Sequence, residues 1–325
     1  MRYITIGKEE KPNSRLALGS TYFGTEIDES TVYAMIDRFI ELGGTTIDTA
    51  RVYGQDGPGK RSASEEVIGA YLSSTGVREH MAIVTKGAHP DGNWKSRITL
   101  KDVQSDVQQS LEALRCTYVD LYFLHRDDPM MPVDEIVDIV NESCSSDMVK
   151  NIGVSNWDVK RIQQANTYAE KHKRRPFVAS EIQWSLATCT PRAYGDITVA
   201  CMDDISFEWY GHHDFPVFAF SSQAKGLFSK AINQGYEALN EKSRIRFLTN
   251  ENRLRIERVR QLCDALSLPV TPTILSYITS QRFPTVAIVG CTHPGQLEDS
   301  LADPDLVLDN NTLTYLFNGG SRHAT

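Results

Sequence analysis

The chain of 325 residues lacks the features that mark membrane, exported and nucleic-acid-binding proteins. No run approaches 18 apolar residues, so no transmembrane helix is predicted. The first residues, MRYITIGKEEKPNSR, hold no apolar stretch after the basic residue, which disfavours an export signal. Positive charge is not in excess, because 34 Lys and Arg oppose 42 Asp and Glu, a net charge of −8. We therefore expect a cytoplasmic protein without nucleic-acid or membrane partners.

Cysteine is sparse and unpatterned. The six cysteines are Cys116, Cys144, Cys189, Cys201, Cys263 and Cys291. They form no CxxC motif and have no histidine at the spacing of a zinc site. They are predicted to be reduced thiols, and no metal is expected.

The sequence does contain helix and strand patterns that alternate along the chain. Apolar residues recur at helical spacing from Val32 to Ile40, Gly43 and Gly44 end that helix, and the β-branched run from Thr45 to Asp48 follows. The same unit repeats, with strands predicted at 16–19, 45–48, 81–86, 118–124, 149–154, 177–182, 216–220 and 285–289. Helices are predicted near 64–72, 99–114, 132–141, 158–172, 251–267 and 272–282.

Eight strands separated by helix-sized segments predict an α/β fold, a (β/α)8 TIM barrel. No linker or change of composition divides the chain, so residues 1–325 are expected to form one domain. We expect a long strand-end loop at 187–215 and a C-terminal tail at 309–325. A doubly wound sheet is the alternative, but no GxGxxG follows the first strand.

Polar residues occupy the carboxyl ends of the predicted strands, where a TIM barrel places its active site. These strand-end residues are Asp48, Lys86, His125, Ser155, Asn156, Glu181, Phe220 and Ser221, and Tyr53 follows Asp48 by five residues. Singly, each has an ordinary structural explanation, such as a helix cap for Asp48 or a buried structural histidine for His125. Together, a carboxylate, an amine, a phenol and an imidazole at one mouth predict proton transfer to a carbonyl.

Elementary electrostatics assigns roles within this group. A phenol titrates near ~10, and an ammonium ~4 Å away at an effective dielectric of ~20 stabilises the phenolate by about 4 kcal/mol, about three pKa units. Lys86 is therefore expected to lower the pKa of Tyr53, and Asp48 to keep Lys86 charged. His125 remains to orient or polarise the substrate oxygen.

The sequence resembles the aldo-keto reductases over nearly its whole length. The motifs that carry the resemblance are IDTARVYG (47–54), VTK (84–86), SLEALRCTYVDLYFLHRDDP (110–129) and IGVSNW (152–157). The family's catalytic tetrad falls on Asp48, Tyr53, Lys86 and His125. The resemblance implies hydride transfer between a nicotinamide and an aldehyde, ketone or sugar, with Tyr53 as general acid or base.

The resemblance also implies cofactor contacts, with NADP as the family's usual cofactor and NAD possible. The matching positions are Ser20, Thr21, Ser155, Asn156, Glu181, Phe220, Ser221, Gln223, Gly290, Thr292, Gln296 and Ser300. Glu181 replaces the family's carboxamide-binding Gln, and an ionised carboxylate can accept but not donate a hydrogen bond. Basic residues are missing at Gly290, Thr292 and Gln296, which weakens the expected preference for NADP.

Aromatic residues in the strand-end loops are candidates for the substrate pocket, namely Tyr22, Trp94, Trp157 and Trp209. The insertion from Gln55 to Ala63 and the 187–215 loop are candidate specificity elements. Substrate identity, reaction direction and oligomeric state stay open.

Two other functions remain possible at this stage. One is a cofactor-binding regulatory subunit with little turnover, because such proteins can keep the tetrad. The other is a metal-dependent barrel hydrolase that uses Asp48, His125 and Glu181.

Overall fold

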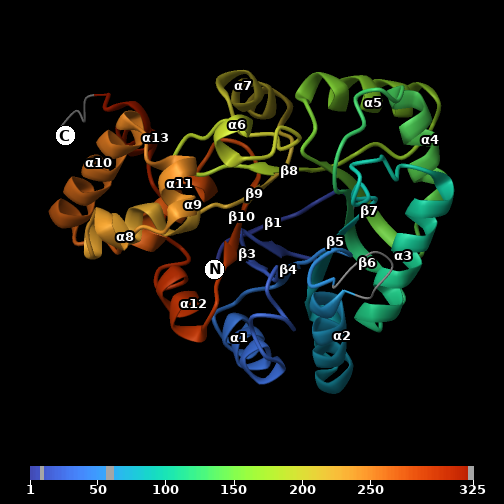
Figure 1. Cartoon of the computed structure of the whole chain (residues 1–325), viewed down its shortest axis with the longest axis horizontal. Coiled ribbons are helices and arrows are strands. Elements are labelled where there is room, and N and C mark those ends of the chain that lie inside the picture. Colours follow the sequence, from blue (N-terminus) through green and yellow to red (C-terminus); the bar gives the residue numbers. More distant parts are fainter. Residues whose placement is uncertain (8–10, 56–61, 321–325) are drawn as a thin grey trace.

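Eight parallel strands close into a barrel in the computed structural model, which describes residues 1–7, 11–55 and 62–320 (Figure 1). The strand order around the barrel is β10-β3-β4-β5-β6-β7-β8-β9. The strands are β3 (Leu16–Gly19), β4 (Thr46–Asp48), β5 (Ala82–Gly87), β6 (Val119–Leu124), β7 (Val149–Ser155), β8 (Ser180–Gln183), β9 (Val217–Phe220) and β10 (Thr285–Gly290). The predicted TIM barrel is therefore confirmed.

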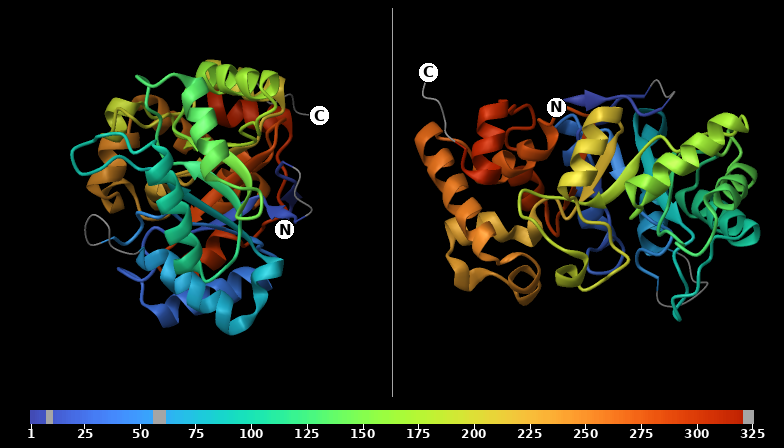
Figure 2. Two further views of the ribbon diagram at one scale, coloured as in Figure 1. Left: turned by 90° about the vertical axis from the view of Figure 1, so that its right-hand side faces the viewer. Right: turned by 90° about the horizontal axis from the view of Figure 1, so that it is seen from above.

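Helices surround the barrel on its outer side (Figures 1 and 2). They are α1 (Glu29–Glu41), α2 (Ala63–Thr75), α3 (Leu100–Leu114), α4 (Val133–Ser143), α5 (Val159–Lys171), α6 (Pro191–Tyr194), α7 (Asp204–His213), α8 (Leu227–Asn233), α9 (Glu241–Phe247), α10 (Asn250–Leu266), α11 (Val270–Thr279), α12 (Pro294–Ser300) and α13 (Asn310–Asn318). Within the described ranges, no helix has both the length and the apolar character needed to cross a membrane.

Local sequence explains the helix boundaries. Asp28 caps α1 by accepting from the Thr31 amide, and Thr99 caps α3 by accepting from the Asp102 amide. Ser62 caps α2 in the same way through the Glu65 amide, as its spacing predicts, but the Glu65 carboxylate binds the Thr85 hydroxyl at 2.6 Å instead of returning to the cap.

The barrel interior is apolar below the site. Its side chains are Ala17, Val84, Leu121, Phe123, Ala179, Phe218, Val286 and Ile288, together with Ile6 from the N-terminal segment. The hairpin of β1 (Tyr3–Ile4) and β2 (Asn13–Ser14) lies at the end where the strands begin, because Ser14 exchanges hydrogen bonds with Thr45, just before β4. Sequence periodicity did not predict this hairpin, whose strands have two residues each.

Three segments differ from the sequence predictions. Strand β8 begins at Ser180 rather than at 177, because the chain from 172 to 179 is an irregular approach to the barrel. The stretch 187–215 is not one irregular loop, since Asp203 caps the ten-residue helix α7 within it and Thr190 caps α6. The predicted tail after 309 contains α13, which Asp309 caps. These helices begin at polar capping residues, and they are too short for a repeating apolar pattern to predict them from the sequence.

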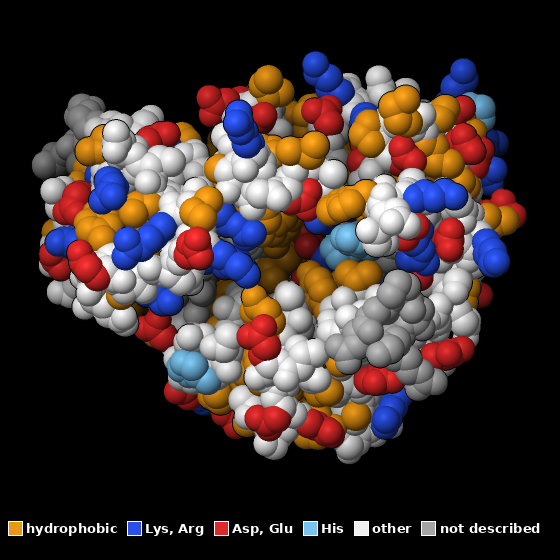
Figure 3. All heavy atoms as spheres, viewed as in Figure 1, with side chains coloured by type: hydrophobic (Ala, Val, Ile, Leu, Met, Phe, Trp, Pro, Cys, Tyr) orange, Lys and Arg blue, Asp and Glu red, His pale blue; other side chains and the backbone are white. Residues whose placement is uncertain are grey.

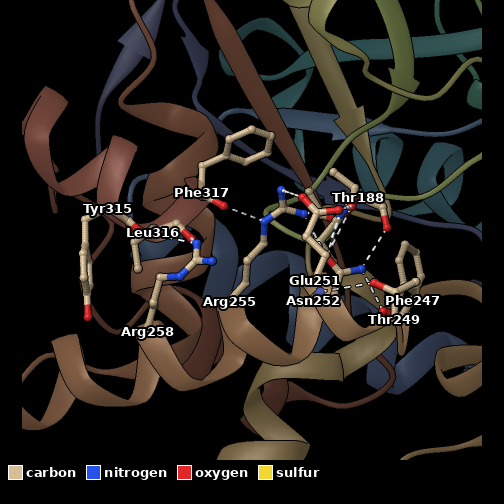
Figure 4. Close-up of polar contacts among 12 residues, drawn as sticks. Thr188, Phe247, Thr249, Glu251, Asn252, Arg255, Arg258, Tyr315, Leu316 and Phe317 are labelled. Atoms are coloured by element: carbon tan, nitrogen blue, oxygen red, sulfur yellow. Dashed lines mark hydrogen bonds and ion pairs between the residues drawn. The ribbon is translucent and has the colours of Figure 1, made fainter. Parts of the chain in front are cut away.

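Helices α8, α10 and α13 gather on one side of the barrel, at the left in Figure 1. Figure 4 shows the buried Arg255 of α10 at the centre of this group. Its guanidinium donates to the Phe317 carbonyl at 2.9 Å, the Thr188 hydroxyl at 2.8 Å and the Asn252 side-chain oxygen at 2.9 Å, and it pairs with Glu251. This network ties α13 and the chain after β8 to α10.

Candidate active site

A cleft of about 650 Å³ opens at the carboxyl ends of the strands. Its walls include Thr21, Tyr22, Asp48, Tyr53, His89, His125, Arg126, Ser155, Asn156, Glu181, Tyr194, Val199, Phe220, Ser221, Gln223, Lys225, Lys230, Gly290, Thr292, Gln296, Asp299 and Ser300. Figure 3 shows a hollow near the centre of the molecular face, with Lys and Arg side chains along its left edge. One cleft thus joins the mouth of the barrel to the loops after β9 and β10.

Lys86 is buried with no exposed surface, in contact with the cleft residues Asp48 and Glu181. Its ammonium donates to Asp48 Oδ1 at 2.6 Å and to the Thr49 carbonyl at 2.9 Å. Burial by itself would lower the pKa of Lys86, but the charges of Asp48 and Glu181 raise it above its usual value. Lys86 is therefore a permanently charged ammonium held beneath the Tyr53 ring, 5.2 Å from the ring centroid.

Glu181 supplies a second carboxyl group to Lys86, at 3.3 Å. Burial and the charge of Asp48 together raise the pKa of Glu181 to about 8, against the opposing effect of Lys86. When protonated, Glu181 donates a hydrogen bond to Asp48. At neutral pH the cluster therefore holds a charged Lys86, an ionised Asp48 and a protonated Glu181, and it has no net charge. Sequence analysis paired Lys86 with Asp48 alone.

Burial raises the pKa of Tyr53 to about 12. Lys86 and a hydrogen bond with Thr21 lower that pKa, whereas Asp48 and Glu181 raise it. The predicted electrostatic effect of Lys86 is thus present, but burial and the two carboxyl groups outweigh it here. The phenol is protonated at neutral pH, as a proton donor must be.

His125 stands across from Tyr53, with the two rings edge to face and 6.1 Å apart. Burial lowers the pKa of His125 well below its usual value, and the neighbouring His89, Arg126 and Lys86 lower it further. The imidazole is therefore neutral, and its buried Nδ1 has no hydrogen-bond partner among the residues that the structure describes. His89 packs against His125 at 4.8 Å and was not singled out from the sequence, although it follows the end of β5 by only two residues.

Two predicted cofactor residues have left-handed backbone conformations. Asn156 has φ of 62° and Ser221 has φ of 52°, values that are uncommon outside glycine and that cluster at binding sites. The Asn156 side chain is fixed by the His125 carbonyl at 3.3 Å and the Ser155 hydroxyl at 2.9 Å. Both strained residues face the cleft.

Most other predicted cofactor positions also line the cleft. Thr21, Ser155, Glu181, Phe220, Gln223, Gly290, Thr292, Gln296 and Ser300 are all in its wall. Ser20 is not, because its buried hydroxyl donates to the Asp48 carbonyl at 2.8 Å. Its position instead braces the strand that holds Asp48.

Charge is unevenly distributed at the end of the cleft near α12. Lys225 and Lys230, which sequence analysis passed over, line the wall after β9. On the α12 side, the Thr292 amide and hydroxyl both bind Gln296 Oε1, at 2.9 and 3.1 Å. Asp299 also lines the cleft, whereas Glu298 points to Arg38 at 2.9 Å.

Of the four predicted substrate-pocket residues, one lines the cleft and three do not. Tyr22 lines the cleft. Trp94 does not line it: its side chain is 57% exposed and contacts the ring of His89, which is in the cleft wall. Trp157 is buried against Phe177, and Trp209 stacks on His213 of the same helix, so neither reaches the cleft. Most of the insertion from Gln55 to Ala63 lies outside the described residues.

Other wall residues come from the chain after β6 and β8, and sequence analysis did not select them. They are Arg126, Tyr194 and Val199. Arg126 directly follows His125, which is the signal that could have identified it.

The hydrolase alternative conflicts with the position of Lys86. A metal bound by Asp48 and Glu181 would have to occupy the space between them, and the Lys86 ammonium contacts both carboxyl groups. No group of three or more His, Cys, Asp or Glu in the described part of the chain is arranged to hold a metal. The cluster is therefore an ion-paired group of one amine and two carboxyl groups.

The sequence profile described as the Aldo/keto reductase family matches residues 15–316. The chain therefore belongs to this family and is an oxidoreductase of the carbonyl-reducing class.

Individual relatives agree. The chain is 28% identical to the uncharacterized oxidoreductase YrpG of Bacillus subtilis over 97% of this chain and 95% of that protein. It is 29% identical to norsolorinic acid reductase B of Aspergillus parasiticus over 59% of this chain and 52% of that protein. With the aryl-alcohol dehydrogenase [NADP(+)] of Phanerodontia chrysosporium, it shares 30% identity over 49% of this chain and 43% of that protein.

Proposed function

We propose that this protein is an NAD(P)(H)-dependent reductase of a small aldehyde, ketone or sugar, or a dehydrogenase of the corresponding alcohol by the reverse reaction. The observation that carries the proposal is the buried Lys86, 2.6 Å from Asp48 and beneath the ring of Tyr53, with neutral His125 opposite. A phenol, an ammonium and an imidazole that converge on one open cleft suit proton transfer to a carbonyl oxygen.

Each residue has a distinct role in this proposal. Tyr53 donates its phenolic proton to the substrate oxygen during reduction and accepts it during oxidation. Lys86 stabilises the phenolate that forms, because it keeps its charge throughout. The neutral imidazole of His125 orients the substrate oxygen by a hydrogen bond from a ring N–H. A bound nicotinamide supplies or accepts the hydride.

The residues of the cleft fit a dinucleotide. Asn156 and Ser221 offer strained, preorganised polar groups, and Phe220 adds an aromatic ring to the same cleft. A Cβ placed on Gly290 would meet nothing within 4 Å, so the backbone there leaves room for a ligand. Asn156, Ser155 and one Glu181 oxygen would hold the carboxamide, and Phe220 would stack on the nicotinamide ring.

The cofactor preference is proposed to be small. An absent Arg or Lys on the 2′-phosphate lowers the preference for NADPH by about 10- to 100-fold, since a charge-assisted hydrogen bond contributes about 1.5–3 kcal/mol. Asp299 in the wall adds repulsion, while Lys225 and Lys230 attract phosphate from the other side. We expect NADPH to be favoured over NADH by less than about 100-fold, or not at all.

A spectrophotometric screen tests this function. The protein would be supplied with NADPH or NADH and a panel of aldehydes, ketones and sugars. Aryl aldehydes belong in the panel because one relative is named an aryl-alcohol dehydrogenase. Turnover that Tyr53→Phe abolishes supports the proposal. Tight dinucleotide binding without turnover across the panel would instead support the regulatory subunit.

A further inference from the structure

A second cleft, of about 400 Å³, lies on the outer side of the barrel. Its wall is formed by the chain after β8 and by α7, α11 and α13. No described residue lines both this cleft and the active-site cleft, although Gln183 of the second cleft follows Glu181 of the first by only two positions on β8. The second cleft is therefore a separate cavity that the proposed reaction does not use.

The Arg255 network holds two sides of the second cleft in fixed positions. Thr188 and Phe317 both line it. Arg255 lies between them in Figure 4 and donates to the Thr188 hydroxyl at 2.8 Å and to the Phe317 carbonyl at 2.9 Å. Asp203 also lines the cleft, and as the cap of α7 it accepts from the Ser206 amide at 2.7 Å. The cleft is therefore preformed by the fold.

Aromatic rings in contact with one another form the apolar part of the wall. Trp184 meets Phe207 edge to face at 6.1 Å and Tyr277 edge to face at 6.4 Å. The Tyr277 ring in turn stacks on Phe317 at 6.2 Å, and all four residues line the cleft. Aromatic walls bind flat rings by stacked and edge-to-face contacts, and a cleft of this size has room for a molecule of one or two rings.

Gln183 adds a buried polar group that has no partner. It lines the cleft, it is 2% exposed, and its Nε2 makes no hydrogen bond with any residue that the structure describes. A buried donor without an acceptor destabilises the folded protein, so such groups are few in native structures. An oxygen of a bound molecule would accept this hydrogen bond.

Charge decides which molecules the second cleft excludes. Among the described residues, its wall holds three carboxylates, Asp203, Asp204 and Glu208, and one cation, Arg282. Arg282 pairs with Glu208 at 2.7 Å. The remaining negative charge repels an anion, so the accepting oxygen belongs to an uncharged group rather than to a carboxylate or a phosphate.

We propose that the second cleft binds an uncharged molecule of one or two aromatic rings that carries a carbonyl oxygen. Its rings lie against Trp184, Phe207, Tyr277 and Phe317, and its oxygen accepts a hydrogen bond from Gln183 Nε2. This binding site goes beyond the reductase function and does not depend on it, because the two clefts have separate walls.

Isothermal titration calorimetry with 2-naphthamide tests the site. This compound has two aromatic rings and an uncharged amide with a carbonyl oxygen, and the full-length protein should bind one equivalent of it. 2-Naphthoate, which has the same rings and a negative charge at pH 7, should bind at least about tenfold more weakly. Absence of saturable binding of 2-naphthamide, or equal binding of the two compounds, would overturn the proposal.

Gln183→Met isolates the hydrogen bond, because it keeps the length of the side chain and removes the amide. The affinity for 2-naphthamide should fall by about tenfold. The melting temperature should not fall, since the variant removes a buried donor without a partner in the described structure. An unchanged Kd in the folded variant would show that the amide does not hold the ligand and would contradict the proposal.

Thr314→Trp tests the position of the site without disturbing the core, because Thr314 of α13 is exposed and lines the cleft. The larger side chain should weaken 2-naphthamide binding at least about tenfold. Asn311→Trp is the matched control, since Asn311 is exposed on the same helix but outside the wall. Tyr22→Ala alters the active-site cleft instead and should leave the Kd unchanged. Weaker binding in Tyr22→Ala but not in Thr314→Trp would place 2-naphthamide in the active-site cleft and overturn the proposal.

Discussion

Lys86 and Arg255 are both buried cations, but their surroundings differ. Lys86 is surrounded by two carboxyl groups that are themselves buried, and it faces an open cleft through the Tyr53 ring. Arg255 is satisfied mainly by neutral acceptors, and its single carboxylate partner, Glu251, is 60% exposed. Both side chains are almost completely inaccessible to water.

The difference separates a site that handles protons from one that holds structure. Around Lys86, ionisable groups share protons, so the pKa values of Tyr53 and Glu181 depend on one another. Around Arg255, the buried acceptors are a backbone carbonyl, a hydroxyl and an amide oxygen, which carry no titratable proton, and they join three separate segments. Burial of a charge alone therefore does not indicate function, whereas coupling to other titrating groups does.

The largest expected effect comes from Tyr53→Phe. Removing the proton donor should reduce kcat by about 10²–10⁴-fold. The Arg255 network should be unaffected, so the melting temperature and the dinucleotide Kd should stay close to wild type. Turnover near the wild-type value with chemistry rate-limiting would show that another group transfers the proton.

Lys86→Met removes the charge and keeps a side chain of similar length. Loss of the ammonium should raise the pKa of Tyr53 by roughly three units, which slows alcohol oxidation by about 10³-fold because that direction needs the phenolate. The pH profile of kcat for oxidation checks this. Asp48→Asn should show a weaker effect in the same direction, and unchanged profiles in both variants would remove the ion pair from the mechanism.

Arg255→Lys keeps a charge but cannot match four acceptors with three N–H donors. The free energy of unfolding should fall by about 1.5–3 kcal/mol, the contribution of one hydrogen bond to a charged group. Denaturant unfolding measures the loss, and kcat for the folded protein should not change. Arg258→Lys is the matched control, since Arg258 binds only backbone carbonyls of α13. A fall in kcat with Arg255→Lys would show that Arg255, like Lys86, contributes to activity and not only to stability.

Thr292→Arg adds a cation on the α12 side of the cleft, where the wall has no Lys or Arg among the described residues. The preference for NADPH over NADH should increase by about 10- to 100-fold. Kd values for both cofactors, measured by fluorescence, check the shift. If wild-type protein already prefers NADPH by well over 100-fold, Lys225 and Lys230 are the first residues to test for the phosphate contact.

Glu181→Gln isolates the second carboxyl group of Lys86. Because its pKa in the folded protein is raised from 4.5 to about 8, Glu181 favours folding below pH 4.5 and loses that contribution as the pH rises toward 8. The variant should therefore gain stability relative to wild type between about pH 5 and 8. Thermal unfolding across this range measures it, and a constant difference would show that Glu181 does not take up a proton.

Much of the fold could be predicted from the sequence. Parallel strands that are buried on both faces appear as short apolar runs, and helices between them appear as longer periodic ones, so the barrel follows from their alternation. The boundaries of β8 and the helices α6, α7 and α13 could not be predicted in the same way. Their lengths are too short for periodicity to show.

The strand-end rule also brought the tetrad and most cofactor candidates to one mouth, because every parallel strand ends at the same edge of the barrel. It did not tell which loop residues face inward. Trp157 follows Asn156 directly, yet it turns into the core against Phe177 while Asn156 lines the cleft.

The order of residues along the chain by itself determined the family, the barrel and the identity of the charged groups at its mouth. Only the tertiary structure decided how those groups are paired and which are neutral. A pKa depends on burial and on distances of a few ångströms between residues far apart in sequence, as between Lys86 and Glu181.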